Sequence, residues 1–142
     1  MPQIAVKPFV LRDCTLNLKD GATDIGDFEM HVSKVEITPN VAVQSWKGLS
    51  PAAVFQDVAQ PEWTANVDYA QDWETANSLS QYALANVGKK VTAKFTPKKG
   101  TGAKAITVVV TMLPGGIGGT VGAFATGSLA LPVDGQPALA AA

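Results

Sequence analysis

Few residues in the sequence have the types and spacing that catalysis requires. His31 is the only histidine, so a Ser–His–Asp triad would have to use it, and no serine lies in the glycine-flanked turn that exposes a hydrolase nucleophile. A metal site would need His31 with Cys14 or with carboxylates, at a ligand spacing that the sequence lacks. We expect His31 at a strand end and Cys14 packed as a small apolar group. No enzymatic activity, cofactor or metal is predicted.

Two further groupings have structural explanations. Asp68 and Asp72 are spaced like a carboxylate pair, but Asp68 ends a strand pattern and Asp72 stands where a helix cap is wanted. The glycines between Gly115 and Gly119 lack the Lys-Ser/Thr or dinucleotide spacing of a phosphate-binding loop, and a strand pattern follows them. We interpret them as a flexible connection that orders on assembly.

The charges are divided along the chain, although they sum to −1. Residues 1–87 carry five basic and eleven acidic side chains, whereas residues 88–142 carry six lysines and one aspartate. The lysines are Lys89, Lys90, Lys94, Lys98, Lys99 and Lys104. Phe95 alone is interleaved with them, which argues against a base-stacking platform. Two interpretations remain, a solvated hairpin and salt bridges to an acidic neighbouring subunit.

Length and composition indicate one domain over residues 1–142. The chain is 46% hydrophobic and 16% charged, as in ordinary globular domains. It has no run of about 20 apolar residues, so no membrane association is predicted. Lys7, Arg12 and Asp13 interrupt the early apolar stretches before a signal peptide could form, and we expect the protein to be made and kept in a cytoplasm.

Short segments of alternating apolar residues predict a mainly β fold, an antiparallel arrangement with one flanking helix. The clearest strand has Trp63, Ala65, Val67 and Tyr69 on its buried face. Further strands are expected near 14–19, 31–38, 41–46, 91–96, 105–113 and 124–131. A helix is predicted at about 72–87, capped by Asp72 and followed by Gly88.

Three segments are expected to lie outside this framework. They are an N-terminal arm at about 1–10, a long loop at about 47–61 and a C-terminal tail at about 132–142, whose last five residues would fray. These are the pieces that a lone domain buries poorly.

The order of several motifs resembles one family. Residues 63–97, WTANVDYAQDWETANSLSQYALANVGKKVTAKFTP, then PGGIGG at 114–119 and PVDGQP at 132–137, are similar to the middle and end of the major tail (tail tube) proteins of long, flexible-tailed bacteriophages, the siphophages. These motifs extend from Trp63 toward the C-terminus, and residues 1–60 match only in general pattern.

The resemblance implies a β-sandwich or half-barrel that assembles as hexameric rings stacked into a tube. Genomic DNA would pass through the lumen during ejection without specific binding. The protein would be a structural component of the virion tail, assembled in the host bacterial cytoplasm, with tape measure, tail terminator and distal tail proteins as partners. A monomeric immunoglobulin-like binding or virion decoration module is the alternative.

Candidate surfaces for such a tube follow from the strand pattern. Two sets of residues could face the lumen: Glu62, Thr64, Asn66 and Asp68, or Thr107, Val109 and Thr111. Stacking is expected to use residues 1–7, 49–60 and the chain from Pro132. The candidate contacts between subunits or rings are Phe55, Asp57, Lys94, Lys98, Lys99, Lys104 and Asp134.

Overall fold

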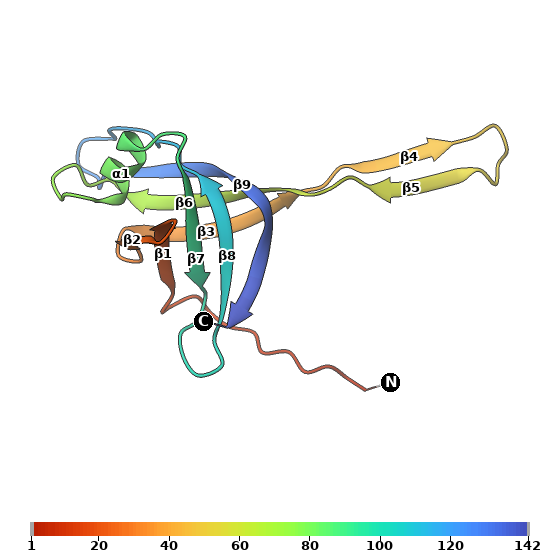
Figure 1. Ribbon diagram of the computed structural model, residues 1–142, viewed down its shortest axis with the longest axis horizontal. Coiled ribbons are helices and arrows are strands. Elements are labelled where there is room, and N and C mark those ends of the chain that lie inside the picture. Colours follow the sequence, from red (N-terminus) through yellow and green to blue (C-terminus); the bar gives the residue numbers. More distant parts are fainter. Residues whose placement is uncertain (1, 142) are drawn as a thin grey trace.

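The structure is a computed structural model that describes residues 2–141, and it is mostly β (Figure 1). Its elements are β1 (Thr15–Asp20), β2 (Thr23–Asp27), β3 (Val32–Asn40), β4 (Val43–Lys47), β5 (Val54–Val58), β6 (Glu62–Ala70), α1 (Leu79–Ala85), β7 (Lys90–Thr96), β8 (Lys104–Thr111) and β9 (Thr126–Ala141). Seven strands form an antiparallel sheet in the order β2-β1-β7-β8-β9-β6-β3, and β4 and β5 pair separately. The predicted β-sandwich or half-barrel class is confirmed.

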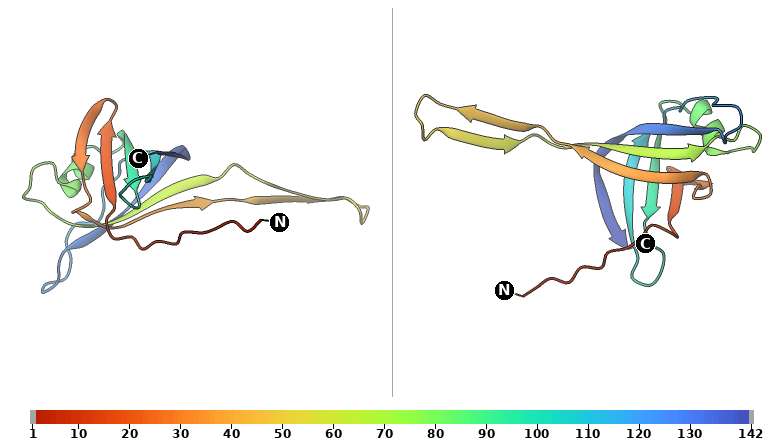
Figure 2. Two further views of the ribbon diagram at one scale, coloured as in Figure 1. Left: turned by 90° about the horizontal axis from the view of Figure 1, so that it is seen from below. Right: turned by 180° about the vertical axis from the view of Figure 1, so that it is seen from behind.

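The long strand β9 joins two halves of the sheet. Its first part, Thr126–Pro132, pairs with β6, and the part from Val133 to Ala141 pairs with β8. Between these parts the strand bends, so that β3 and β6 run lengthwise while β7 and β8 cross them steeply (Figures 1 and 2). The two halves therefore fold over one another and enclose the core.

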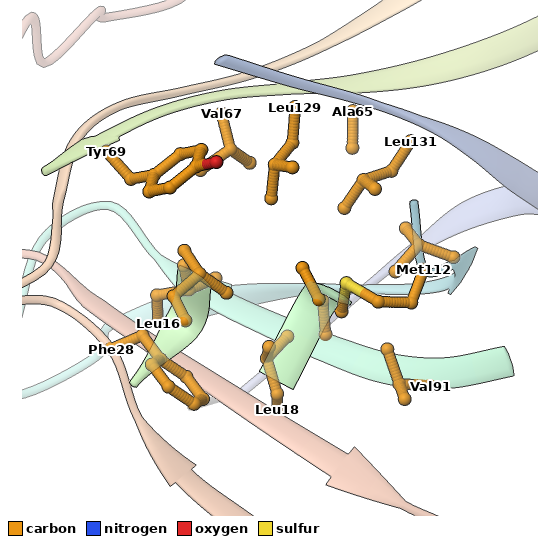
Figure 3. Close-up of a cluster of buried hydrophobic side chains, with 14 of the residues drawn as sticks. Leu16, Leu18, Phe28, Ala65, Val67, Tyr69, Val91, Met112, Leu129 and Leu131 are labelled. Atoms are coloured by element: carbon orange, nitrogen blue, oxygen red, sulfur yellow. The ribbon is translucent and has the colours of Figure 1, made fainter. Parts of the chain in front are cut away.

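Side chains from both halves meet in this core (Figure 3). One side is lined by Ala65, Val67 and Tyr69 of β6 with Leu129 and Leu131 of β9, and the other by Leu16, Leu18, Phe28 and Val91. The period-2 pattern that predicts β6 is confirmed, because Ala65, Val67 and Tyr69 are all buried.

The helix is shorter than predicted. It covers Leu79–Ala85 instead of 72–87, and its N-cap is Ser78, whose hydroxyl accepts from the Gln81 N–H. Asp72 instead closes a turn: its Oδ1 accepts from the N–H groups of Glu74 and Thr75 at 3.0 and 3.1 Å. A side-chain hydrogen bond with Thr75, added to these backbone bonds, lowers the pKa of Asp72.

The prediction of a free C-terminal tail was wrong. Residues 138–141, expected to fray, pair with residues 104–107 of β8. The turn-like residues of PVDGQP form a β-bulge. Residues 135–137 of β9 lie opposite Val108 alone, and Gly135 has a φ of 88°. Residue 142 lies outside the described part of the chain.

The predicted long loop at 47–61 was also wrong, because it contains β5. Residues 43–58 form a hairpin, named here the hairpin arm, that continues the β3–β6 pair away from the body (Figure 1). Its turn is closed by the Gly48 N–H bonding to the Ala53 carbonyl at 2.7 Å. The sequence of β5, VFQDV, has no apolar–polar alternation, so no local pattern indicated this strand.

The core requires two glycines beside Tyr69. A Cβ at Gly115 would overlap the Tyr69 hydroxyl, and a Cβ at Gly127 would lie 2.9 Å from it. We predict that Gly115→Ala lowers the free energy of unfolding by about 1–3 kcal/mol, because the ring must shift in a packed site. Tyr69→Phe in the same chain should restore part of this loss.

Urea denaturation followed by circular dichroism measures the effect. Gly116→Ala is the matched control, since its added Cβ has no atom within 4 Å, and it should change stability by less than about 0.5 kcal/mol. Equal losses for the two alanine variants would contradict the packing described here.

Candidate assembly surfaces

The residues first considered for catalysis have local contacts. The half-buried Cys14 donates its S–H to the Pro97 carbonyl at 3.2 Å. The His31 ring lies edge-on to Phe28, with centroids 5.5 Å apart, and its Nδ1 has no hydrogen-bond partner within residues 2–141. Over the same residues, no group of three or more His, Cys, Asp and Glu side chains could hold a metal ion.

No helix between residues 2 and 141 is both long and apolar enough to cross a membrane. An open hollow of about 620 Å³ lies between residues 8–13 and the β7–β8 turn. Its lining is half apolar, from Pro8, Phe9, Val10 and Pro97, and half charged, from Arg12, Asp13, Lys98 and Lys99.

The two candidate lumen sets lie on the outer faces of different halves of the sheet. Thr64, Asn66 and Asp68 of β6 alternate with the buried residues of that strand, and Glu62 is exposed at its start. Thr107 and Thr111 lie on β8, alternating with the buried Val108 and Val110. The structure therefore does not combine the two sets into one surface.

The outer face of β3 and β6 is polar and carries more acid than base. Register places Glu36 beside Asn66, Lys34 beside Asp68 and Thr38 beside Thr64. Hydrogen bonds cross this face, from the Asn66 amide to the Thr38 hydroxyl at 3.3 Å and from the Ser128 hydroxyl to the Asp68 carboxylate at 2.7 Å. Its charged groups are Lys34, Glu36, Glu62 and Asp68. These bonds fix the side chains, and the balance of charge repels phosphate.

The outer face of β7 and β8 carries lysines instead. Register places Lys94 directly beside Thr107, and Lys90 directly beside Thr111. Asp134, beside Val109, pairs with Lys90, so a polyanion that touched these threonines would meet the ammonium group of Lys94.

Several lysines of the C-terminal third already have partners within the chain. Lys89 pairs with Asp20, Lys90 with Asp134 at 3.0 Å, and Lys99 with Asp13 at 3.2 Å. Lys94, Lys98 and Lys104 form no salt bridge within the described residues. The candidate contacts Lys99 and Asp134 are thus paired within the chain, whereas Lys94, Lys98 and Lys104 are not paired among the described residues.

The Lys89–Asp20 pair links β1 to the start of β7. The Asp20 carboxylate raises the pKa of Lys89 through a hydrogen bond and through its charge. A raised lysine pKa stabilises the fold at pH values below the unfolded value near 10.5, and this contribution disappears as pH rises through the folded pKa. Both side chains are partly exposed, so the contribution is small.

The hairpin arm exposes apolar side chains on both of its faces. Trp46 and Phe55 form a cross-strand pair, with ring centroids 5.9 Å apart, and remain 62% and 61% exposed. Val43, Val54 and Val58 are more than half exposed on the other face. An isolated two-stranded hairpin is marginal in water, so this arm needs a partner surface.

The N-terminal arm, residues 2–11, is a second unpartnered segment. It contains no helix or strand, and the side chains of Ile4, Val6 and Val10 are 94%, 81% and 70% exposed. It reaches from the body toward the same side as the hairpin arm in all three views (Figures 1 and 2). Residues 2–7 of this arm belong to the segment expected to take part in stacking, and they remain exposed in the single chain.

The opposite end of the body carries a third apolar surface. Residues 114–125, named here the glycine loop, lie at the end of the body away from the hairpin arm (Figures 1 and 2). Ile117, Val121 and Phe124 project from it with exposed fractions of 68%, 101% and 95%. The glycines are evident in the sequence, whereas these three side chains are not, because isolated apolar residues in a loop follow no period.

Because the arm forms its own sheet, we predict that Trp46→Ser with Phe55→Ser leaves the stability of the body unchanged to within about 0.5 kcal/mol. Leu129→Ala, in the core, should cost about 2–5 kcal/mol in the same denaturant titration. If the arm variant lost as much as the core variant, the arm would have to pack against its own body.

In comparisons with known proteins, no family model and no curated protein matches the sequence.

Proposed function

We propose that the chain is a structural virion protein that polymerises as stacked hexameric rings and forms a phage tail tube, through which the genome passes during ejection. The observation that carries this proposal is the placement of apolar surface: the hairpin arm and the N-terminal arm extend to one side, and the glycine loop lies at the other end. The motif resemblance from Trp63 to Pro137 supports the same function.

Unlike surfaces at opposite ends favour open assembly. When a patch on one copy binds a different patch on the next, each added copy presents the first patch again, and growth continues until a terminator binds. Ring formation would in turn cover the free edges of β2 and β3, which otherwise invite aggregation. Tape measure, terminator and distal tail proteins are the partners that we propose at the centre and ends of such a tube.

The lumen is best assigned to the β3–β6 face. A conduit must let DNA slide, and lysines would hold the duplex by releasing its counterions. Glu62, Thr64, Asn66 and Asp68 lie on a face with three carboxylates and one lysine, whereas Thr107 and Thr111 stand beside Lys94 and Lys90. Of the two candidate sets, we therefore propose the first.

Self-assembly of the purified protein tests the proposal. Electron microscopy at rising concentration should show rings and tubes, and Trp46→Ser with Phe55→Ser should yield folded protein without tubes. Met30→Ser is the matched control: Met30 is 95% exposed but lies outside the arms and the glycine loop, so its variant should assemble normally. A protein that stays monomeric at every concentration would contradict tube formation and favour the monomeric binding module.

Lysines introduced at the two candidate faces test the lumen assignment. Tubes with Thr64→Lys and Asn66→Lys should protect a short DNA duplex from nuclease at about 50 mM salt and lose it at about 200 mM, since counterion release governs binding. Tubes with Thr107→Lys and Thr111→Lys should bind the duplex without protecting it. Protection by the second pair alone would reverse the assignment.

A further inference from the structure

The glycine loop is held in place by one side chain, Gln71, just after β6. Its amide nitrogen donates to the carbonyls of Gly118 and Thr126 at 2.9 and 2.7 Å, and its Oε1 accepts from the Gly118 N–H at 3.0 Å. The Gln71 backbone N–H also bonds to the Ala125 carbonyl at 2.9 Å. These bonds close residues 118–126 into a fixed loop, although its three glycines would otherwise leave it flexible.

The fixed loop presents an apolar surface that the described residues of its own chain do not cover. None of residues 114–125 is ionisable, and Ile117, Val121 and Phe124 point away from the core. Holding such a loop in one conformation lowers the entropy lost on binding a partner. The Gln71 contacts would therefore strengthen binding as well as order the loop.

The tip of the hairpin arm matches this surface in chemistry. Residues 48–56, GLSPAAVFQ, contain no ionisable group, and Leu49 at the turn is fully exposed. Lys47, which lies beside Val54 in the β4–β5 register, is the one charged side chain at the tip, and the glycine loop carries no charge that would repel it. The hairpin arm is also paired into a defined shape, unlike the N-terminal arm, so it pays less ordering entropy.

We propose that the glycine loop, fixed by Gln71, is the docking surface for the tip of the hairpin arm of a second copy of this chain in the adjacent ring. The two surfaces lie at opposite ends of the molecule, so the contact repeats from ring to ring in one direction. This inference rests on the proposed tube assembly and names the two surfaces that join one ring to the next.

Thiol crosslinking between copies tests the contact. In a Cys14→Ser background that still forms tubes, Gln56→Cys combined with Val121→Cys should give a ladder of covalent multimers with a short bismaleimide. Each single variant should give dimers at most, and Gln56→Cys combined with Thr23→Cys, on β2, should give no ladder.

Tubes that form without the 56–121 ladder would overturn this inference and leave the proposed function intact. Crosslinking of Val121→Cys to Ala5→Cys instead would assign the loop to the N-terminal arm and also overturn it. If the Cys14→Ser protein and the wild type both failed to form tubes, the proposed function itself would fail.

Substitution of Gln71 tests its role in positioning the loop. Gln71→Glu retains the size but loses both donors to Gly118 and Thr126, so we expect a rise of at least tenfold in the concentration at which tubes appear, with the circular dichroism spectrum of the monomer unchanged. Gln136→Ala, an exposed glutamine in the β9 bulge, is the control and should leave this concentration unchanged. An unchanged threshold for Gln71→Glu would show that the loop needs no fixing to bind.

Discussion

Apolar surface that one chain cannot bury is the constraint on which this structure depends. The body has a closed core between the two halves of its sheet, yet Trp46 and Phe55 at one end and Val121 and Phe124 at the other remain in water. Contiguous apolar surface of this kind marks interaction sites in soluble proteins. Its placement at opposite ends is the basis on which we propose repeated self-association.

The body holds these ends at fixed positions. The bend in β9 lets one strand pair with both β6 and β8, which ties the lengthwise strands to the crossing ones. The hairpin arm grows directly from β3 and β6, and Gln71 at the other end of β6 fixes the glycine loop. One strand pair therefore connects the two proposed contact surfaces, and its polar outer face is the proposed lumen.

The sequence predicted those parts of the fold that depend on local pattern. Val67 and Tyr69 alternate with polar residues because one side of β6 is buried. This alternation predicts both the strand and the face that it turns to the core. Asp72 was assigned to the helix cap, but Ser78 holds that position because an Asx turn intervenes. Gly135 and Pro137 are typical of a turn or a free tail. No local pattern reveals that β8 pairs with the residues on either side of them.

The candidate surfaces were only partly predictable for the same reason. Phe55 could be named as a contact because a long apolar segment without a core role needs a partner. The neighbours of Thr107 and Thr111 depend on the register with β7, which places Lys94 and Lys90 beside them. This register, which the sequence does not reveal, makes the charge around the two candidate lumen sets different. The Gln71 contacts join residues 47 and 55 positions apart, beyond the reach of sequence spacing.

Hydrogen exchange in the hairpin arm tests the central claim most directly. Backbone amides of β4 and β5 should exchange rapidly in dilute protein, because a two-stranded hairpin with no covering surface opens readily. In concentrated protein the same amides should become protected, together with those of residues 114–125, while the rates in β7 and β8 stay constant. Equal exchange in the arm at both concentrations would contradict the account, because its apolar faces would then have no partner among copies of this chain.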